Sequence, residues 1–111
     1  MVISGASDGL EAVQKARLLQ PDVILMDVNM PGLNGFEATQ QIRTASPCSK
    51  ILFLSGVGDL DFIERAFSVG GLGYILKSDV HADLVSGIRT VLCGQRFLSR
   101  SLRNLSVKPV S

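Results

Sequence analysis

Residues 22–35, DVILMDVNMPGLNG, combine a short apolar run with a loop that is rich in turn-forming residues. Four apolar residues run without interruption from Val23 to Met26, which is typical of a strand buried on both faces of a parallel sheet. Asp27 then lies at the carboxyl end of that strand, where open α/β sheets bind their ligands. A carboxylate in this place can act as a nucleophile or hold a cation. A surface aspartate that merely ends a strand explains this stretch equally well.

Strand and helix patterns alternate on both sides of this stretch. Short apolar runs alternate with segments in which apolar residues recur at helical spacing, and this order implies βαβ units around a parallel sheet. We therefore expect an α/β fold with three layers, doubly wound. The pattern predicts strands at residues 2–5, 23–26, 51–54 and 73–76, and helices between Asp8 and Pro21 and at 35–45, 59–69 and 82–93. Phe97 and Leu98 suggest a further helical turn.

Each of the three core strands ends in a polar residue: Asp27, Ser55 and Lys77. In a parallel sheet these three side chains meet above one edge, and together they suit the transfer of a phosphoryl group to a carboxylate. Asp27 would attack phosphorus, Ser55 would donate a hydrogen bond to one phosphoryl oxygen, and Lys77 would neutralise another. A serine before glycine is more often a turn residue, and a lysine after a strand more often faces solvent. Their coincidence at successive strand ends favours a site.

Composition limits the class of protein. The 111 residues suffice for one domain, and the hydrophobic fraction of 46% is that of a soluble globular protein. No apolar run approaches the roughly 20 residues needed to span a bilayer, so we expect no membrane association. Cys48 and Cys93 have no metal or redox spacing, which indicates reduced thiols in the cytoplasm. Residues 84–111 carry five basic residues and no acid, which is more often a solvated face or linker than a nucleic-acid contact.

The sequence resembles a known family through three of these segments. Residues 22–35, ILFLS at 51–55 and GYILK at 73–77 are similar in order and spacing to the receiver domains of bacterial two-component response regulators. Further segments resemble the LuxR-type (NarL/FixJ-like) subfamily, in which a DNA-binding helix-turn-helix domain follows the receiver. They are ASDG at 6–9, KS at 77–78, IRTV at 88–91 and GQRFLS at 94–99. The resemblance implies a flavodoxin-like (CheY-like) doubly wound sheet.

The resemblance also implies roles for individual residues. Asp27 would accept a phosphoryl group from a sensor histidine kinase, and Ser55 and Lys77 would contact it. Ser55 and Tyr74 would form the conformational switch, although Tyr74 can equally be read as an ordinary half-buried aromatic on an edge strand. Asp27 and the backbone carbonyl of Asn29 would be ligands of Mg²⁺. By this reading the chain is a phosphoacceptor signalling domain and no enzyme.

The sequence departs from the family pattern at both ends. The first strand of the family, with the pair of acids that follows it, and the first helix have no counterpart here, so we expect Mg²⁺ binding to be weak or absent. We expect an incomplete receiver domain at residues 1–95 and a basic linker at 96–111. The linker would lead toward an output domain, absent from this sequence, through which alone DNA would be contacted.

The missing strand has a consequence for the sheet, because it separates the segments 2–5 and 23–27 in the family. Buried backbone groups left without partners are costly. Either residues 2–5 move in beside residues 23–27, which gives about four parallel strands in chain order, or a second copy covers the gap. The apolar face left bare would include Val23 and Leu25. We therefore expect a homodimer or a larger assembly.

Two other functions remain open. A receiver that is never phosphorylated can serve as an interaction module, and the missing acids favour this reading. Phosphatases of the haloacid-dehalogenase type also place an aspartate, a serine or threonine and a lysine at strand ends. They need a second aspartate two residues after the first as general acid and base, and here that residue is Asn29.

Overall fold

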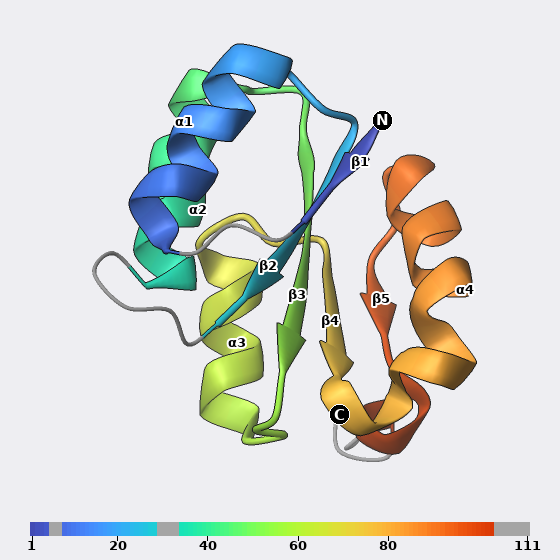
Figure 1. The fold of residues 1–111 in the computed structure, drawn as a ribbon. Helices are drawn as coiled ribbons and strands as arrows, with labels where there is room; N and C mark the ends of the chain where they lie inside the picture. Colours follow the sequence, from blue (N-terminus) through green and yellow to red (C-terminus); the bar gives the residue numbers. More distant parts are fainter. Residues whose placement is uncertain (5–7, 29–33, 104–111) are drawn as a thin grey trace.

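The computed structural model describes residues 1–4, 8–28 and 34–103 of the chain. Strands and helices alternate along it, a short 3-10 turn joins the fourth strand to the fourth helix, and a second 3-10 turn follows the fifth strand (Figure 1). The strands are β1 (Val2–Ile3), β2 (Val23–Asp27), β3 (Lys50–Ser55), β4 (Gly73–Leu76) and β5 (Phe97–Leu98). The helices are α1 (Gly9–Leu19), α2 (Gly35–Ala45), α3 (Leu60–Ser68) and α4 (Val80–Leu92), and the 3-10 turns are η1 (Lys77–Asp79) and η2 (Arg100–Leu102).

All five strands form one parallel sheet in the order β1-β2-β3-β4-β5. Helices α1, α2 and α3 cover one face and α4 covers the other, which gives the three layers expected from the sequence (Figure 1). Alternation along β2 explains this arrangement, because successive side chains of a strand point to opposite faces. Ile24 and Met26 belong to the core under α1–α3, whereas Val23 belongs to the core under α4. The predicted fold class is confirmed.

The first strand lies directly beside β2, as the within-chain alternative predicted. Val2 pairs with Val23 and Ile3 pairs with Ile24. The predicted strand extended to residue 5, which lies outside the described residues. This pairing satisfies backbone groups of β2 that would otherwise lack partners at that edge.

The sheet has one strand more than the four expected. Phe97–Leu98, which we expected to be helical, forms β5 at the far edge: Phe97 N donates to Leu72 O at 3.0 Å and Ser99 N donates to Tyr74 O at 3.1 Å. Two residues are too few for strand alternation to be visible in a sequence. The segment expected to be linker from residue 96 thus begins with a strand of the same sheet.

The second face of the sheet is better covered than expected. Val23 is fully buried and Leu25 is partly buried, because α4 packs across β2, β3 and β4. The expectation that Val23 would lie bare is therefore wrong. Among the described residues, every helix is too short or too polar to span a lipid bilayer.

Candidate functional site

Parallel pairing brings the three predicted residues to one edge of the sheet. Asp27 is the last residue of β2, Ser55 is the last residue of β3, and Lys77 directly follows β4 as the first residue of η1. In the register of the sheet Asp27 lies beside Leu54, and Ser55 lies beside Leu76. The strand ends therefore stand side by side, as the sequence predicted.

Asp27 and Lys77 are in direct contact. Lys77 Nζ donates to Asp27 Oδ2 at 2.7 Å, and the two side chains come from positions 50 residues apart in the chain. The Lys77 side chain is 53% exposed and that of Asp27 is 36% exposed, so the pair sits at the protein surface. An ion pair this open to solvent contributes roughly 0–1 kcal/mol to stability. The pair matters for position rather than for stability, because it holds the Lys77 ammonium group within hydrogen-bond distance of the solvent-accessible Asp27 carboxylate.

Ser55 is almost fully buried and its hydroxyl is held by the loop between β3 and α3. The Oγ atom accepts a hydrogen bond from Val57 N at 3.0 Å and donates to Val57 O at 3.3 Å. This arrangement fixes the direction of the hydroxyl at the strand end. The same Val57 carbonyl also accepts a hydrogen bond from the Tyr74 hydroxyl.

Tyr74 lies inward in this structure and is fully buried among the residues under α1–α3. Its hydroxyl donates to Val57 O at 2.7 Å. The reading of Tyr74 as a half-buried residue on an edge strand is wrong, because β5 makes β4 an internal strand. Burial raises the pKa of the Tyr74 phenol, the neighbouring Ser55 hydroxyl opposes that rise, and the charge of Asp59 adds to it.

The Val57 carbonyl was not foreseen from the sequence. It accepts hydrogen bonds from both Ser55 and Tyr74, and so connects the two side chains that the resemblance assigns to a switch. A backbone carbonyl carries no residue-type signal, and only the shape of the loop places this one between the two hydroxyls.

Tyr74→Phe should lower the free energy of unfolding by about 1 kcal/mol, because a buried hydrogen bond to Val57 O is lost. The variant should also lack the loss of folding stability that the wild type shows at alkaline pH. Above the ordinary tyrosine pKa of 10.0 the unfolded chain loses the phenol proton while the folded chain keeps it, so stability falls as the pH rises from there to the folded pKa. Urea denaturation at neutral and alkaline pH measures both effects.

The alkaline effect has a direct spectroscopic control. The chain has one tyrosine and no tryptophan, so the ultraviolet absorbance of phenolate reports Tyr74 alone. The titration midpoint should be higher in the folded protein than in urea. Equal midpoints in the two conditions would contradict the inward, hydrogen-bonded position.

The described side chains do not make a complete magnesium site by themselves. Within residues 1–4, 8–28 and 34–103 no three His, Cys, Asp or Glu side chains come together in a way that could hold a metal ion. Asp27 supplies one carboxylate, and that carboxylate is paired with Lys77. Asn29, whose carbonyl the resemblance suggests as a ligand, lies outside the described residues. Magnesium needs near-octahedral oxygen coordination, which these groups alone do not provide.

The fold and the strand ends define the class: a flavodoxin-like parallel α/β domain with aspartate, serine and lysine at the carboxyl edge of its sheet. Residues 1–89 match the response regulator receiver domain. The chain belongs to this family of two-component signalling domains.

Individual relatives agree with the family. The chain is 40% identical over 98 residues to the response regulator GacA of Pseudomonas viridiflava. The aligned region covers 88% of this chain and 46% of GacA. It is 41% identical over 102 residues to the transcriptional regulatory protein LnrK of Bacillus subtilis, covering 91% of this chain and 46% of LnrK. The chain thus spans about half the length of the curated relatives that it matches.

Solved structures show the same fold. A LuxR-family two-component response regulator from Aurantimonas sp. SI85-9A1 superposes with a TM-score of 0.85 at 34% identity, over 92% of this chain and 73% of that one. The response regulator domain of Thermotoga maritima CheB superposes with a TM-score of 0.70 at 32% identity, over 78% of this chain and 72% of that one.

Proposed function

We propose that this domain accepts a phosphoryl group on Asp27 from a sensor histidine kinase and so switches an output or dimerisation surface. The contact of Lys77 Nζ with Asp27 Oδ2 at 2.7 Å carries the proposal. It places a positive charge beside a strand-end carboxylate that can act as a nucleophile. Membership of the receiver family supports the same role.

The transfer itself needs little from the protein beyond position and charge. An oxygen of the Asp27 carboxylate attacks phosphorus, and a P–O bond forms while the bond from phosphorus to the donor breaks. The leaving group, an imidazole nitrogen of a phosphohistidine or the carboxylate of an acyl phosphate, departs with the electron pair. Lys77 moves from the carboxylate to a phosphoryl oxygen, and the Ser55 hydroxyl turns to donate to another.

The switch follows from the shared carbonyl. When the Ser55 hydroxyl turns toward the phosphoryl group, it gives up its bonds with Val57, and the Tyr74 hydroxyl keeps the carbonyl alone. The loop between β3 and α3 then settles in a second position. A small change in hydrogen bonding thereby becomes a repacking of the surface made by α3, β4 and α4.

The remaining roles concern the rest of a longer regulator. We propose that the receiver, expected from the sequence at residues 1–95, extends through β5 and η2, and that the residues after Arg103 lead toward an output domain through which DNA is bound. A Staphylococcus aureus relative of known structure is described as a DNA-binding response regulator of the LuxR family; it superposes with a TM-score of 0.70 at 27% identity. Assembly into a homodimer and a cytoplasmic location complete the proposal.

One observation favours a second candidate, a receiver that is not phosphorylated and acts only as an interaction module. Within the described part of the chain Asp27 has no pair of further acids with which it could hold a metal ion. The two candidates differ in whether the chain can be labelled.

Incubation of the whole chain with acetyl phosphate and magnesium chloride separates them. We expect intact-mass spectrometry to show one added phosphoryl group, with a rate that keeps rising beyond low-millimolar magnesium because the metal binds weakly. The same protein in urea should add none, since its strand ends are dispersed. A folded chain that adds no phosphoryl group at any magnesium concentration would support the interaction module instead.

A further inference from the structure

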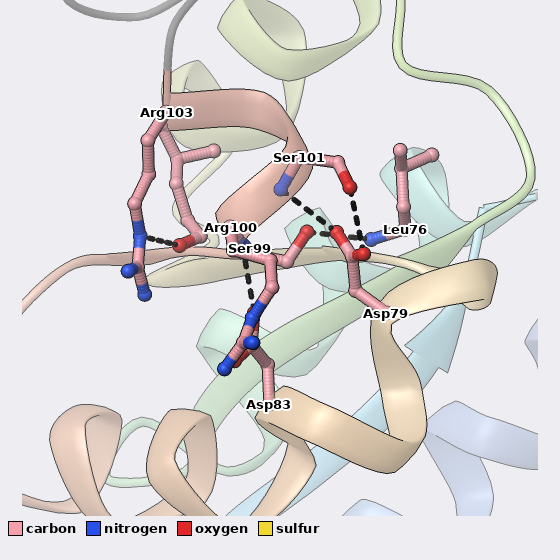
Figure 2. A network of polar contacts seen from close by, with 8 residues as sticks. Leu76, Asp79, Asp83, Ser99, Arg100, Ser101 and Arg103 are labelled. Atoms are coloured by element: carbon pink, nitrogen blue, oxygen red, sulfur yellow. Dashed lines mark hydrogen bonds and ion pairs between the residues drawn. The ribbon is translucent and has the colours of Figure 1, made fainter.

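The segment Ser99–Arg103, which follows β5, is fastened to the corner between β4 and α4 by two aspartates. Figure 2 shows this network of polar contacts. Asp83, on the first turns of α4, is 2% exposed and binds Arg100 three times. Its Oδ2 accepts from Arg100 N at 2.7 Å, and its Oδ1 accepts from Arg100 Nε at 3.1 Å and from Nη2 at 3.0 Å.

Asp79 makes the second attachment, one residue further along the segment. Its carboxylate accepts from Ser101 N at 3.1 Å and from Ser101 Oγ at 2.7 Å (Figure 2). The Ser101 hydroxyl is the main reason why the pKa of the Asp79 carboxyl lies below its usual value. The Arg100 backbone N–H is the main cause of the same lowering at Asp83. Both acids therefore stay ionised and hold the segment with charge-assisted hydrogen bonds.

Two further contacts join this segment to the loops at the candidate site. Leu76 N, at the end of β4, donates to Ser99 Oγ at 3.0 Å. Leu102 is 2% exposed and lies against Gly58, where a Cβ would come within 2.9 Å of Leu102 Cδ2. Gly58 follows Val57 in the loop that binds Ser55 and Tyr74. The segment thus contacts the loop after β3 and the corner after β4 at once.

The corner also carries Lys77. Lys77 and Asp79 are the first and last residues of the single turn η1, so a shift of the Lys77 backbone moves Asp79 with it. A phosphoryl group on Asp27 would place its oxygens farther from the strand than the carboxylate oxygen that Lys77 now contacts. When Lys77 follows these oxygens outward, the strain falls on η1, and the bonds from Asp79 to Ser101 lie two residues away.

We propose that Ser99–Arg103 is a clasp that reports the state of Asp27 to the chain that follows Arg103. In the present state, with Lys77 on the Asp27 carboxylate, the clasp is closed on Asp79 and Asp83. Displacement of Lys77 loosens it. The phosphoryl part of this inference rests on the proposed function, whereas the coupling of Lys77 to the clasp does not. Because coupling free energies are reciprocal, holding the clasp closed also disfavours phosphorylation of Asp27.

Amide hydrogen exchange, resolved by residue, tests the clasp at Arg100 and Ser101. In the full chain, Asp83→Asn should speed exchange at Arg100 by at least tenfold, because the amide loses its ionised acceptor. Asp61→Asn changes an exposed acid on α3 and should leave both amides within twofold of the wild type. Amides of β3 serve as the internal reference, since general unfolding would speed them too.

Lys77→Ala tests the coupling without any phosphoryl group. Lys77 is exposed, so its loss should spare the fold, yet exchange at Ser101 and Arg100 should become at least tenfold faster, because the clasp is loosened. Lys50→Ala, a matched loss of a lysine at the other end of the sheet, should have no such effect. Exchange at both amides within twofold of the wild type in Lys77→Ala would overturn the clasp, as would an unchanged Arg100 amide in Asp83→Asn.

A final arm separates the clasp from the proposed function. The chain is incubated with acetyl phosphate, its intact mass is measured, and exchange is followed on the same sample. A phosphorylated chain should show the change at Ser101 that Lys77→Ala shows, and a phosphorylated chain with an unchanged Ser101 amide would overturn the clasp. A chain without added mass overturns the proposed phosphorylation alone, and the Lys77→Ala result then decides the clasp.

Discussion

Replacement of Asp27 by asparagine should abolish phosphorylation of the chain by acetyl phosphate. The amide has the shape of the carboxylate but lacks the negative oxygen that would attack phosphorus. The fold should survive, because the Asp27–Lys77 pair is exposed and contributes roughly 0–1 kcal/mol at most. Intact-mass spectrometry of the variant and the wild type, treated side by side, measures the phosphorylated fraction.

A matched substitution shows whether the loss is specific to the site. Asp61→Asn removes one exposed acid from α3 and changes the net charge of the chain by the same amount. It should be phosphorylated like the wild type. An unchanged phosphorylated fraction in Asp27→Asn would show that another residue accepts the group, and the assignment of Asp27 would be wrong.

Gly35→Ala should destabilise the fold by about 3 kcal/mol, near the upper end of the usual cost of an added methyl group in a packed site. A Cβ at Gly35 would lie 2.4 Å from the carbonyl oxygen of Asp27 and 3.1 Å from Val28 Cα. Both atoms belong to the backbone at the end of β2, so neither can turn aside. Helix α2 begins at this residue, and the helix preference of alanine, worth about 1 kcal/mol, is too small to offset the clash.

Gly56→Ala is the control for this effect. Apart from its chain neighbours, no described heavy atom lies within 4 Å of a Cβ placed at Gly56, so the free energy of unfolding of Gly56→Ala should differ from the wild type by about 0.5 kcal/mol or less. Urea denaturation of both variants measures the difference. The slope of the free energy of unfolding against urea concentration should be the same in both, which shows that the unfolded state has not changed. If Gly35→Ala is as stable as Gly56→Ala, then α2 does not start against the end of β2 as described.

Local chemistry in the sequence predicts much of the scaffold. Asp8 accepts from Glu11 N at 2.8 Å and begins α1, as a residue of its type before an apolar-periodic segment suggests. Pro21 follows that helix, and α2 runs over the predicted residues 35–45. These features depend on neighbours within a few positions, and such short-range preferences are visible in the residue order.

The meeting of Asp27 and Lys77 was also predictable, for a geometric reason. Once short apolar runs alternate with helices, the strands must be parallel and their carboxyl ends must share one edge. Residues 50 positions apart are thus brought together by the topology alone. The distance of 2.7 Å was not predictable, because it depends on side-chain rotamers and on how η1 turns.

Residue order was therefore enough to predict the fold class, the bounds of most elements and the sheet edge at which Asp27, Ser55 and Lys77 stand. The pairing of β5 with β4, the inward position of Tyr74 and the clasp on Asp79 and Asp83 became visible only in the folded molecule. Asp79 and Asp83 bind partners 22 and 17 positions away, and a two-residue strand leaves no alternation to read. Such contacts depend on which hydrogen-bond donors the folded chain brings beside a buried carboxylate. The order of residues does not contain that information.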